Sequence, residues 1–241
     1  MKVQYLGDVN DYRKYALLRL LALTGLKIGV HWLLTPDDGR NDGGKRSYLA
    51  QLNPWRSYDP ELFDVLATVP PVPTFDDFRQ IEQRDIIPHA VYWDELVPTG
   101  TVARQAYHAA SMEAFVDRDL VFFDPDNGLA VASVTKGRAA GIKFVFDDEL
   151  AEHYAAERSL LIYQHFPRLE RAQFLRDLGV RLRAFAPDAE MWACHTAHVV
   201  FLLVVHPNLS VDQAGAISAA IEDGRRRWSD NFIKFDLLPP A

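Results

Sequence analysis

The stretch "LVFFDPDNGL", residues 120–129, places two carboxylates and an amide directly after a run of four apolar residues. The apolar run predicts a strand that is buried on both faces of a sheet. Pro125 fixes its own backbone and keeps Asp124 extended, so the Asp124 carboxylate should lie at the tip of this strand. Asn127 and Gly128 predict a turn. The stretch is therefore either a well-formed turn or the floor of a binding site.

Strands alternate with helices around this stretch, which predicts an α/β protein with a mostly parallel sheet. The expected strands cover residues 26–35, 85–93, 119–124, 159–164, 190–195 and 198–206, and the last should run antiparallel at or near an edge. The expected helices cover residues 9–24, 60–67, 75–83, 102–116, 146–157, 168–178 and 210–227. We expect one domain over residues 1–241. It should carry the N-terminal helix 9–24, capped by Asn10 or Asp11, and an inserted Pro-rich helical segment at about 53–83.

The composition bounds the class of protein. The chain has 241 residues, 49% of them hydrophobic, and a net charge of −7, which gives one sizeable core and no overall basic footprint for nucleic acid. Cys194 is the only cysteine, which excludes an intrachain disulfide and a cysteine-based zinc site. Charges stand where a signal peptide needs an apolar run, and "VVFLLVVHP" is too short to span a bilayer. We therefore expect a cytoplasmic protein without a membrane partner.

Three polar clusters follow predicted strands. They are "TPDDGRNDGG" at 35–44, "DPDNG" at 124–128 and "YQHFPR" at 163–168. Open parallel sheets bind ligands beyond the carboxyl ends of their strands, so these clusters should line one pocket. The alternative is that they are ordinary polar loops, rich in turn-forming and capping residues.

The "DPDNG" cluster allows two kinds of chemistry. Asp124 and Asp126 could hold a hard cation such as magnesium. Alternatively, Asp124 could accept a hydrogen bond from an exocyclic amine, which suits methylation of an amino group. In the third cluster, His165 titrates near neutral pH, Gln164 can donate and accept, and Arg168 can bind phosphate.

The first cluster, in the loop 35–46, could use its glycines and backbone N–H groups to bind a phosphate or a carboxylate. Arg40 and Lys45 add positive charge, whereas Asp37 and Asp38 oppose an anion unless magnesium intervenes. A surface loop without a ligand is the alternative.

The order of these motifs resembles that of a known family. "GDVNDYRKY", residues 7–15, is similar to a Gly-Asn-His-Ala-Asp-x-x-Lys-His opening, and "DPDN" is similar to an Asp-Pro-Pro-Tyr tetrapeptide after a strand. "IGVHWLLTPDDGRNDGG" stands where a Gly-rich cofactor loop is expected, and "IYQHFPR" where a strand ends in an aromatic, Pro-containing turn. Over most of residues 7–206 the chain resembles the ribosomal RNA large subunit adenine methyltransferase J family. Asp126 and Asn127 depart from the tetrapeptide, so its stacking aromatic is absent.

The resemblance implies a Rossmann-like, class I methyltransferase-like sheet with helices on both faces. It also implies a methyltransferase that uses S-adenosylmethionine on an amino group of a nucleic acid base, without a metal. The implied catalytic residues are Asp124, Pro125, Asp126, Asn127 and His165. The implied cofactor-binding residues are Lys14, Thr35, Asp37, Asp38, Gly39, Arg40 and Asn41. The implied substrate-binding residues are Asn10, Asp11, Tyr15, Gln164 and Arg168.

Two other functions stay open. One is a magnesium-dependent nuclease or phosphohydrolase that uses Asp124 and Asp126. "FFDPDNGL" also resembles the Asp-x-Asp-Gly-Thr motif of haloacid dehalogenase-type phosphatases, although the acids of "VFDDEL", at 145–150, follow too soon for that fold. The other is a non-catalytic binding module on the same fold.

Overall fold

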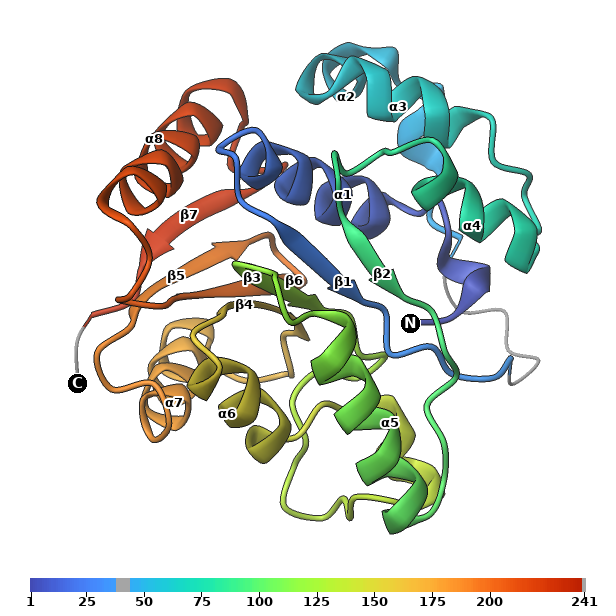
Figure 1. The fold of residues 1–241 in the computed structure, drawn as a ribbon. Helices are drawn as coiled ribbons and strands as arrows, with labels where there is room; N and C mark the ends of the chain where they lie inside the picture. The colour runs from blue at the N-terminus through green and yellow to red at the C-terminus, as the bar shows by residue number, and fades with distance from the viewer. Residues whose placement is uncertain (38–43, 240–241) are drawn as a thin grey trace.

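A computed structural model describes residues 1–37 and 44–239 of the chain. Its centre is a seven-stranded sheet with helices on both faces (Figure 1). The strands are β1 (Ile28–His31), β2 (Val91–Trp93), β3 (Leu120–Phe123), β4 (Ser159–His165), β5 (Glu190–His195), β6 (Val199–Val205) and β7 (Lys234–Leu237). The strand order is β2-β1-β3-β4-β6-β5-β7.

The sheet is mixed. The pairs β1–β2, β1–β3 and β3–β4 are parallel, whereas β6 is antiparallel to both β4 and β5, and β7 is antiparallel to β5. The predicted α/β class is confirmed, and a mostly parallel arrangement holds for the N-terminal half of the sheet. The predicted strand at 198–206 is antiparallel, but its place at or near an edge is wrong. All seven residues of β6 are buried, so this strand lies inside the sheet, and the unpredicted β7 lies at the edge.

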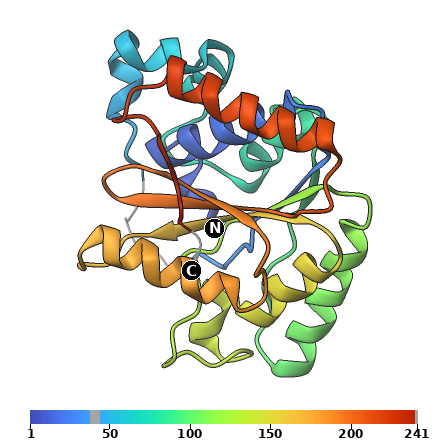
Figure 2. The same ribbon diagram turned by 90° about the vertical axis from the view of Figure 1, so that its left-hand side faces the viewer.

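The helices form two layers. They are α1 (Val9–Ala22), α2 (Leu52–Tyr58), α3 (Pro60–Ala67), α4 (Phe75–Gln83), α5 (Thr101–Ala114), α6 (Asp147–Ala155), α7 (Arg171–Arg183) and α8 (Val211–Arg227). Short 3-10 helices cover Val3–Tyr5, Ser47–Ala50 and Ala139–Lys143. Figures 1 and 2 show α1, α2, α3, α4 and α8 over one face of the sheet, and α5, α6 and α7 over the other. A separate apolar core fills the space between the sheet and each layer.

Helix α1 begins at Val9, as predicted, but its cap is Asp8 rather than the predicted Asn10 or Asp11. The Asp8 carboxylate accepts hydrogen bonds from the backbone N–H groups of Asn10 and Asp11, so neither of these two residues is the cap. A short polar side chain directly before the first helical residue satisfies N–H groups that have no partner within the helix. Capping by Asp8 leaves the Asp11 side chain available for other contacts.

The segment between β1 and β2 holds three helices over α1. Helices α3 and α4 match the predicted ranges, and α2 was not predicted. Tyr12 of α1 donates its hydroxyl hydrogen bond to the carbonyl oxygen of Trp55 at 2.8 Å, which ties α2 to α1. Among the residues that the structure describes, no helix is long and apolar enough to cross a membrane.

Candidate active site

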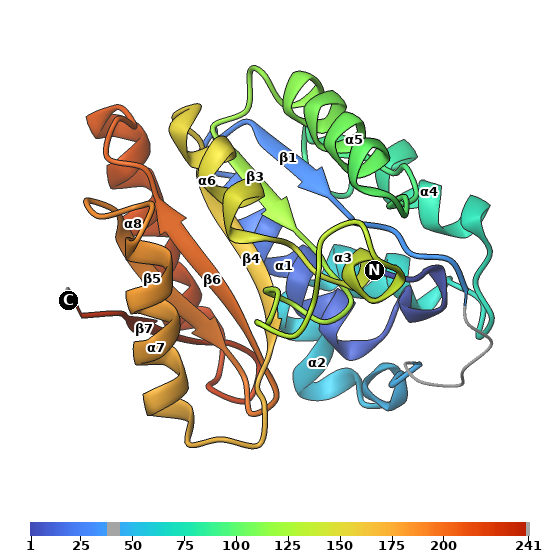
Figure 3. The ribbon, with the colours of Figure 1, turned by 90° about the horizontal axis from the view of Figure 1, so that it is seen from below.

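The order in which successive strands are added to the sheet reverses between β1 and β3. The chain leaves β1 for β2 on one side and later returns to β3 on the other side. Ligands of open α/β sheets bind at such a switch point, outside the carboxyl ends of the strands. Figure 3 shows the N-terminus beside the carboxyl ends of β1 and β3.

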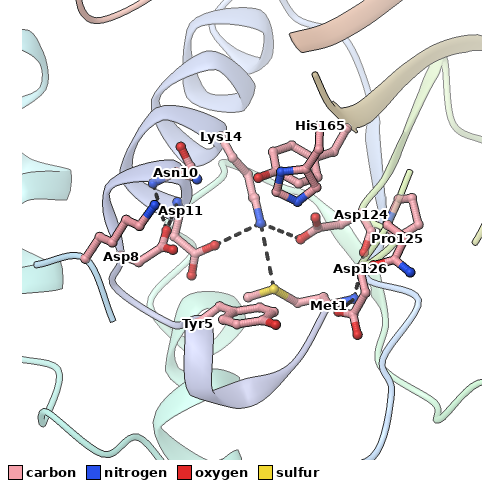
Figure 4. A pocket seen from close by; sticks show the side chains of 13 residues that line it. Met1, Tyr5, Asp8, Asn10, Asp11, Lys14, Asp124, Pro125, Asp126 and His165 are labelled. Carbon is pink, nitrogen blue, oxygen red and sulfur yellow. Dashed lines mark hydrogen bonds and ion pairs between the residues drawn. The ribbon is translucent and has the colours of Figure 1, made fainter. Parts of the chain in front are cut away.

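A cavity of about 260 Å³, partly open to solvent, lies beside this switch point. Its volume is just below the range typical of pockets for drug-sized ligands, about 300–1,000 Å³. The lining residues are Met1, Tyr5, Asp8, Asn10, Asp11, Lys14, Lys45, Asp124, Pro125, Asp126, Asn127, Tyr163 and His165 (Figure 4). They come from the N-terminal segment, α1, the turn after β3 and the end of β4, together with Lys45 from the segment between β1 and α2.

Asp124 is fixed from two directions. Its backbone N–H donates to the carbonyl oxygen of His31 at 3.0 Å, which continues the pairing of β3 with β1 for one more residue. Its carboxylate Oδ2 accepts from Nζ of Lys14 at 2.6 Å, and the residue is 1% exposed. The buried strand therefore delivers Asp124 to the cavity floor, as the sequence predicts.

Lys14 joins α1 to the end of β3. Its ammonium lies 2.8 Å from Oδ1 of Asp11 and 2.6 Å from Asp124, and it lies 5.0 Å from the ring centroid of Tyr163 (Figure 4). Asp11 and Lys14 are three residues apart on a helix, so they share one face. Burial opposes the charge on Lys14, but Asp11 and Asp124 hold the Lys14 pKa well above its ordinary value. Burial raises the Asp11 pKa to about 7, against the opposing effect of Lys14.

Asp126 has its own partners. Its Oδ2 accepts from the Thr35 hydroxyl at 2.6 Å, and its Oδ1 lies 2.9 Å from the α-amine of Met1. Burial alone would raise the Asp126 pKa, but the Met1 ammonium and the Thr35 hydrogen bond lower it below its ordinary value. Burial lowers the pKa of the Met1 α-amine, against the opposing effect of Asp126 and Asp124. The turn after β3 thus holds two carboxylates, each with a separate nitrogen partner.

Gln164 fixes the end of the same turn. Its side-chain Oε1 accepts from the backbone N–H of Leu129 at 2.7 Å, and its Nε2 donates to the carbonyl oxygen of His165 at 2.7 Å. Gly128 has φ +90°, and a Cβ there would lie 2.1 Å from Oε1 of Gln164. Only glycine fits this position, because the conformation and the close approach both exclude a side chain.

The predicted site residues separate into two groups. Eight of them line the cavity, namely Asn10, Asp11, Lys14, Asp124, Pro125, Asp126, Asn127 and His165, and Thr35 is joined to them through Asp126. Asp38, Gly39, Arg40 and Asn41 lie outside the described residues. Asp37 and Arg168 are exposed and do not line this cavity.

Two predicted substrate-binding residues have other roles. Tyr15 follows Lys14 on α1 and is therefore rotated away from the cavity into the apolar core, where it is 0% exposed. Both polar atoms of the Gln164 side chain are used within the protein, so Gln164 shapes the turn rather than the cavity wall. In both positions the sequence identified the segment correctly but not the direction of the side chain.

Sequence reasoning missed four lining residues, which are Met1, Tyr5, Asp8 and Tyr163, whereas it named Lys45 for its positive charge in the first cluster. Asp8 carried a signal, because it directly precedes the helical pattern. Tyr163 belongs to the cluster after the fourth predicted strand, although we assigned no role to it. Nothing in the sequence around Met1 and Tyr5 indicates that the N-terminal segment turns back over the ends of the strands.

The charges of the cavity select its ligands. Four carboxylates line it, from Asp8, Asp11, Asp124 and Asp126, against the side-chain ammonium groups of Lys14 and Lys45 and the amine of Met1. Such a wall favours a neutral or cationic ligand over a phosphate. Within residues 1–37 and 44–239, no group of three or more His, Cys, Asp or Glu side chains could hold a metal ion.

Comparisons with known proteins give little guidance. No family model matches the chain, and no curated protein matches it. A crystal structure of protein LPL1258 from Legionella pneumophila str. Philadelphia 1, in a family described as DUF519, matches with 14% sequence identity and a TM-score of 0.43. The match covers 98% of this chain and 97% of that one. A TM-score this low does not establish a shared fold, and we infer nothing from this match.

Proposed function

We propose that this chain is an S-adenosylmethionine-dependent methyltransferase that acts on an amino group of a nucleic acid base. The observation that carries the proposal is the position of Asp124. This carboxylate stands at the end of β3, ion-paired with Lys14 and followed by Pro125, and it faces the cavity at the switch point of the sheet.

We further propose that the fold is Rossmann-like. The parallel strands β2, β1, β3 and β4 grow outward from β1 in both directions, and helices cover both faces of the sheet. This is the arrangement of doubly wound folds, in which nucleotide-containing cofactors bind at the switch point. Strands β5, β6 and β7 extend the sheet on the side of β4 with mixed directions.

The residues of the cavity fit S-adenosylmethionine. This cofactor carries an ammonium and a positively charged sulfonium, and the cavity wall carries more carboxylates than cations. Asp126 and the carbonyl oxygens at the ends of β1 and β3 would hold the ammonium, and Lys45 would attract the carboxylate. When bound, S-adenosylmethionine supplies an electrophilic methyl group.

The protein's own residues orient the acceptor. The Asp124 carboxylate can accept a hydrogen bond from an exocyclic amino group and so direct the nitrogen lone pair into the cavity. Lys14 holds that carboxylate in place from behind. A base in a duplex would have to leave its stack to reach this depth. Tyr5 and His165 line the same cavity and offer ring faces, which Asn127 does not.

The proposal is tested by calorimetry and by a transfer assay. S-adenosylmethionine should bind without added metal, and the labelled methyl group should pass to RNA or DNA. Asp124→Asn should retain the fold and lose transfer, whereas Asp177→Asn, on the exposed side of α7, serves as the matched control. Stabilisation by magnesium together with cleavage of nucleic acid or phosphate esters would instead favour the nuclease or phosphohydrolase. A chain that binds a nucleic acid but neither S-adenosylmethionine nor magnesium would be a binding module.

A further inference from the structure

The first residue of the chain lies inside the candidate site. The α-amine of Met1 donates to the carbonyl oxygens of Leu33 and Asp124, at 3.1 and 2.9 Å, and lies 2.9 Å from Oδ1 of Asp126. Met1 is 2% exposed. The first residues of most domains are poorly ordered and exposed unless they are tied down. A buried ammonium with three oxygen acceptors is therefore a constructed binding arrangement.

The acceptors come from the two strands that define the switch point. Leu33 follows β1, and Asp124 follows β3. Leu33 has φ +46°, a left-handed conformation that is uncommon for a residue other than glycine. Strained backbone of this kind persists where the surrounding structure fixes it, and it clusters at ligand sites. The strained residue here presents its carbonyl oxygen to the ammonium.

The remaining polar groups of Met1 also have partners. Its carbonyl oxygen accepts from the backbone N–H of Thr35 at 2.9 Å, and its thioether sulfur lies 3.7 Å from Nζ of Lys14 (Figure 4). The site thus contacts an α-amine, a carbonyl and a sulfur on one residue. A free amino acid has a carboxylate where Met1 has its peptide carbonyl, and the Thr35 N–H could donate to either.

We propose that Met1, in a chain that begins at this residue, is a built-in occupant of the ligand site that must withdraw before the ligand enters. The ammonium and sulfur of Met1 stand where the amino-acid end of a sulfur-containing ligand binds, so the two exclude one another. The identity of that ligand rests on the proposed function, because S-adenosylmethionine ends in the same α-amine and carries its sulfur at the same distance along the chain.

Withdrawal can leave the catalytic residues in place. Gly7, with φ +80°, separates the short helix Val3–Tyr5 from α1. Its N–H donates to Oδ2 of Asp11 at 3.1 Å, and Asp8 caps α1 with its own carboxylate. The backbone N–H of Asp8 donates back to the first five residues, at 3.0 Å to the carbonyl oxygen of Tyr5. The segment before Gly7 can therefore turn outward while α1 keeps Lys14 against Asp124.

The test compares two forms of the full chain. One has a free α-amine on Met1, and the other has Gly-Ser before Met1, so that the amine becomes an amide. Calorimetry with S-adenosylmethionine should show binding on the order of 10-fold tighter in the extended form, a gain of about 1.4 kcal/mol. In the unextended chain, saturating S-adenosylmethionine should raise the rate at which an N-hydroxysuccinimide ester acylates the α-amine. Labelling of the exposed Lys234 side chain should not change.

The outcomes separate this inference from the proposed function. Equal dissociation constants in both forms, with an unchanged labelling rate, would overturn the inference even where S-adenosylmethionine is bound. Exposure of the α-amine by L-methionine but not by S-adenosylmethionine would support the inference and contradict the proposed cofactor. No effect of either ligand would contradict both. If thermal unfolding shows that the extension disrupts the fold, the labelling rate of the unextended chain decides alone.

Discussion

Two buried polar clusters lie on opposite faces of the sheet. The pocket cluster consists of Met1, Asp11, Lys14, Asp124 and Asp126, and it faces the cavity. The sealed cluster lies under α5 and α6 and consists of His31, Arg104, Tyr107, His108, Glu149, His153 and Arg158. At its rim the exposed Glu152 pairs with His108. Both clusters bury ionisable side chains beside the same strands. A comparison of how the two clusters pair their charges therefore shows which contacts stabilise the fold and which are expected of a ligand site.

The sealed cluster pairs its groups one to one. Arg104 donates two hydrogen bonds to Glu149, at 2.7 and 2.8 Å, and Nδ1 of His153 lies 3.0 Å from Arg158. Burial, with Arg158 nearby, lowers the His153 pKa to about 2, and burial lowers the His31 pKa well below its ordinary value. Both imidazoles are therefore neutral. The pocket cluster instead retains a charged lysine between two carboxylates beside an open cavity, which is the arrangement of a functional site.

The largest expected effect comes from removing one cation from each cluster. Arg104→Met should cost about 3–5 kcal/mol of unfolding free energy, because the buried Glu149 then loses both of its short ion-pair bonds and keeps only the Phe146 N–H and the more distant Lys136, at 3.7 Å. Lys14→Met should cost less, because Asp11 and Asp124 border a cavity that is partly open to solvent, and Asp11, with a pKa near 7, can take up a proton. Urea unfolding at pH 7 measures both. Glu149→Gln is the control that removes the charge but keeps an acceptor for Arg104. A larger cost for Lys14→Met than for Arg104→Met would break the distinction between the clusters.

The second effect is on transfer rather than on stability. Asp124→Asn should lower methyl transfer on the order of 10²-fold or more, as when a positioned polar catalytic group is lost. Its unfolding free energy should fall by about 1–3 kcal/mol, because Asn keeps the shape of the turn but Lys14 loses one of its two buried carboxylate partners. Asp126→Asn should reduce transfer less, because Asp126 contacts Thr35 and Met1 rather than Lys14. Equal losses at both positions that magnesium reverses would instead favour a two-carboxylate metal site.

Much of the pocket cluster could be predicted from the sequence. The "DPDNG" stretch placed Asp124 correctly, because a continuous apolar strand and Pro125 leave few backbone alternatives. The pairing of Asp11 with Lys14 follows from their spacing on one helical face. Local rules were sufficient wherever a residue's position depends on its near neighbours in the chain.

The sequence could not predict contacts that depend on distant segments. The sealed cluster joins β1, α5 and α6, and no motif marks His31 or His153. The return of Met1 to the end of β3 depends on a contact across 123 positions. The interior place of β6 depends on which neighbours bury its two faces, and periodicity does not distinguish these arrangements.

The third prediction concerns the hydrogen bond from Leu129 to Gln164, which ties the turn after β3 to β4. Gln164→Leu should cost about 1–3 kcal/mol, because the buried N–H of Leu129 loses its acceptor. It should also weaken the binding of S-adenosylmethionine, since the turn that carries Asp124 and Asp126 then loses its bond to β4 and keeps only its other contacts, such as the backbone bonds of Asn127 to Lys143 and of Gly128 to Val145. Gln173→Leu, on the exposed surface of α7, is the control and should change stability by about 0.5 kcal/mol or less. Unaltered binding of S-adenosylmethionine in Gln164→Leu would show that the turn keeps its position without the hydrogen bond to Gln164.

A smaller effect should appear in the pH dependence of the pocket cluster. The folded-state pKa of Asp11 is raised from 3.8 to about 7, chiefly by burial, so folding favours its protonated form. This contribution is fully present below pH 3.8 and is lost as the pH rises through 7. Relative to Asp11→Asn, the wild-type chain should therefore lose stability between about pH 4 and 7, by at most about 1.4 kcal/mol for each pH unit. Urea unfolding across this range measures the difference, and a constant difference would contradict the raised pKa.

The sealed cluster should respond to pH in the opposite direction. The folded-state pKa of His153 is lowered from 6.5 to about 2, first by burial and then by Arg158, so folding favours the neutral imidazole. Its contribution is present above pH 6.5 and is lost as the pH falls below that value. Relative to His153→Gln, which cannot ionise, the wild-type chain should lose stability between pH 6.5 and 5, again by at most about 1.4 kcal/mol for each pH unit. His195→Gln is the control, because His195 lies on β5 near the edge of the sheet and pairs with Asp236 at 2.8 Å. The two clusters are distinct only if Asp11 and His153 give slopes of opposite sign. Slopes of the same sign would mean that water reaches both clusters alike, and the contrast between an open site and a sealed core would fail.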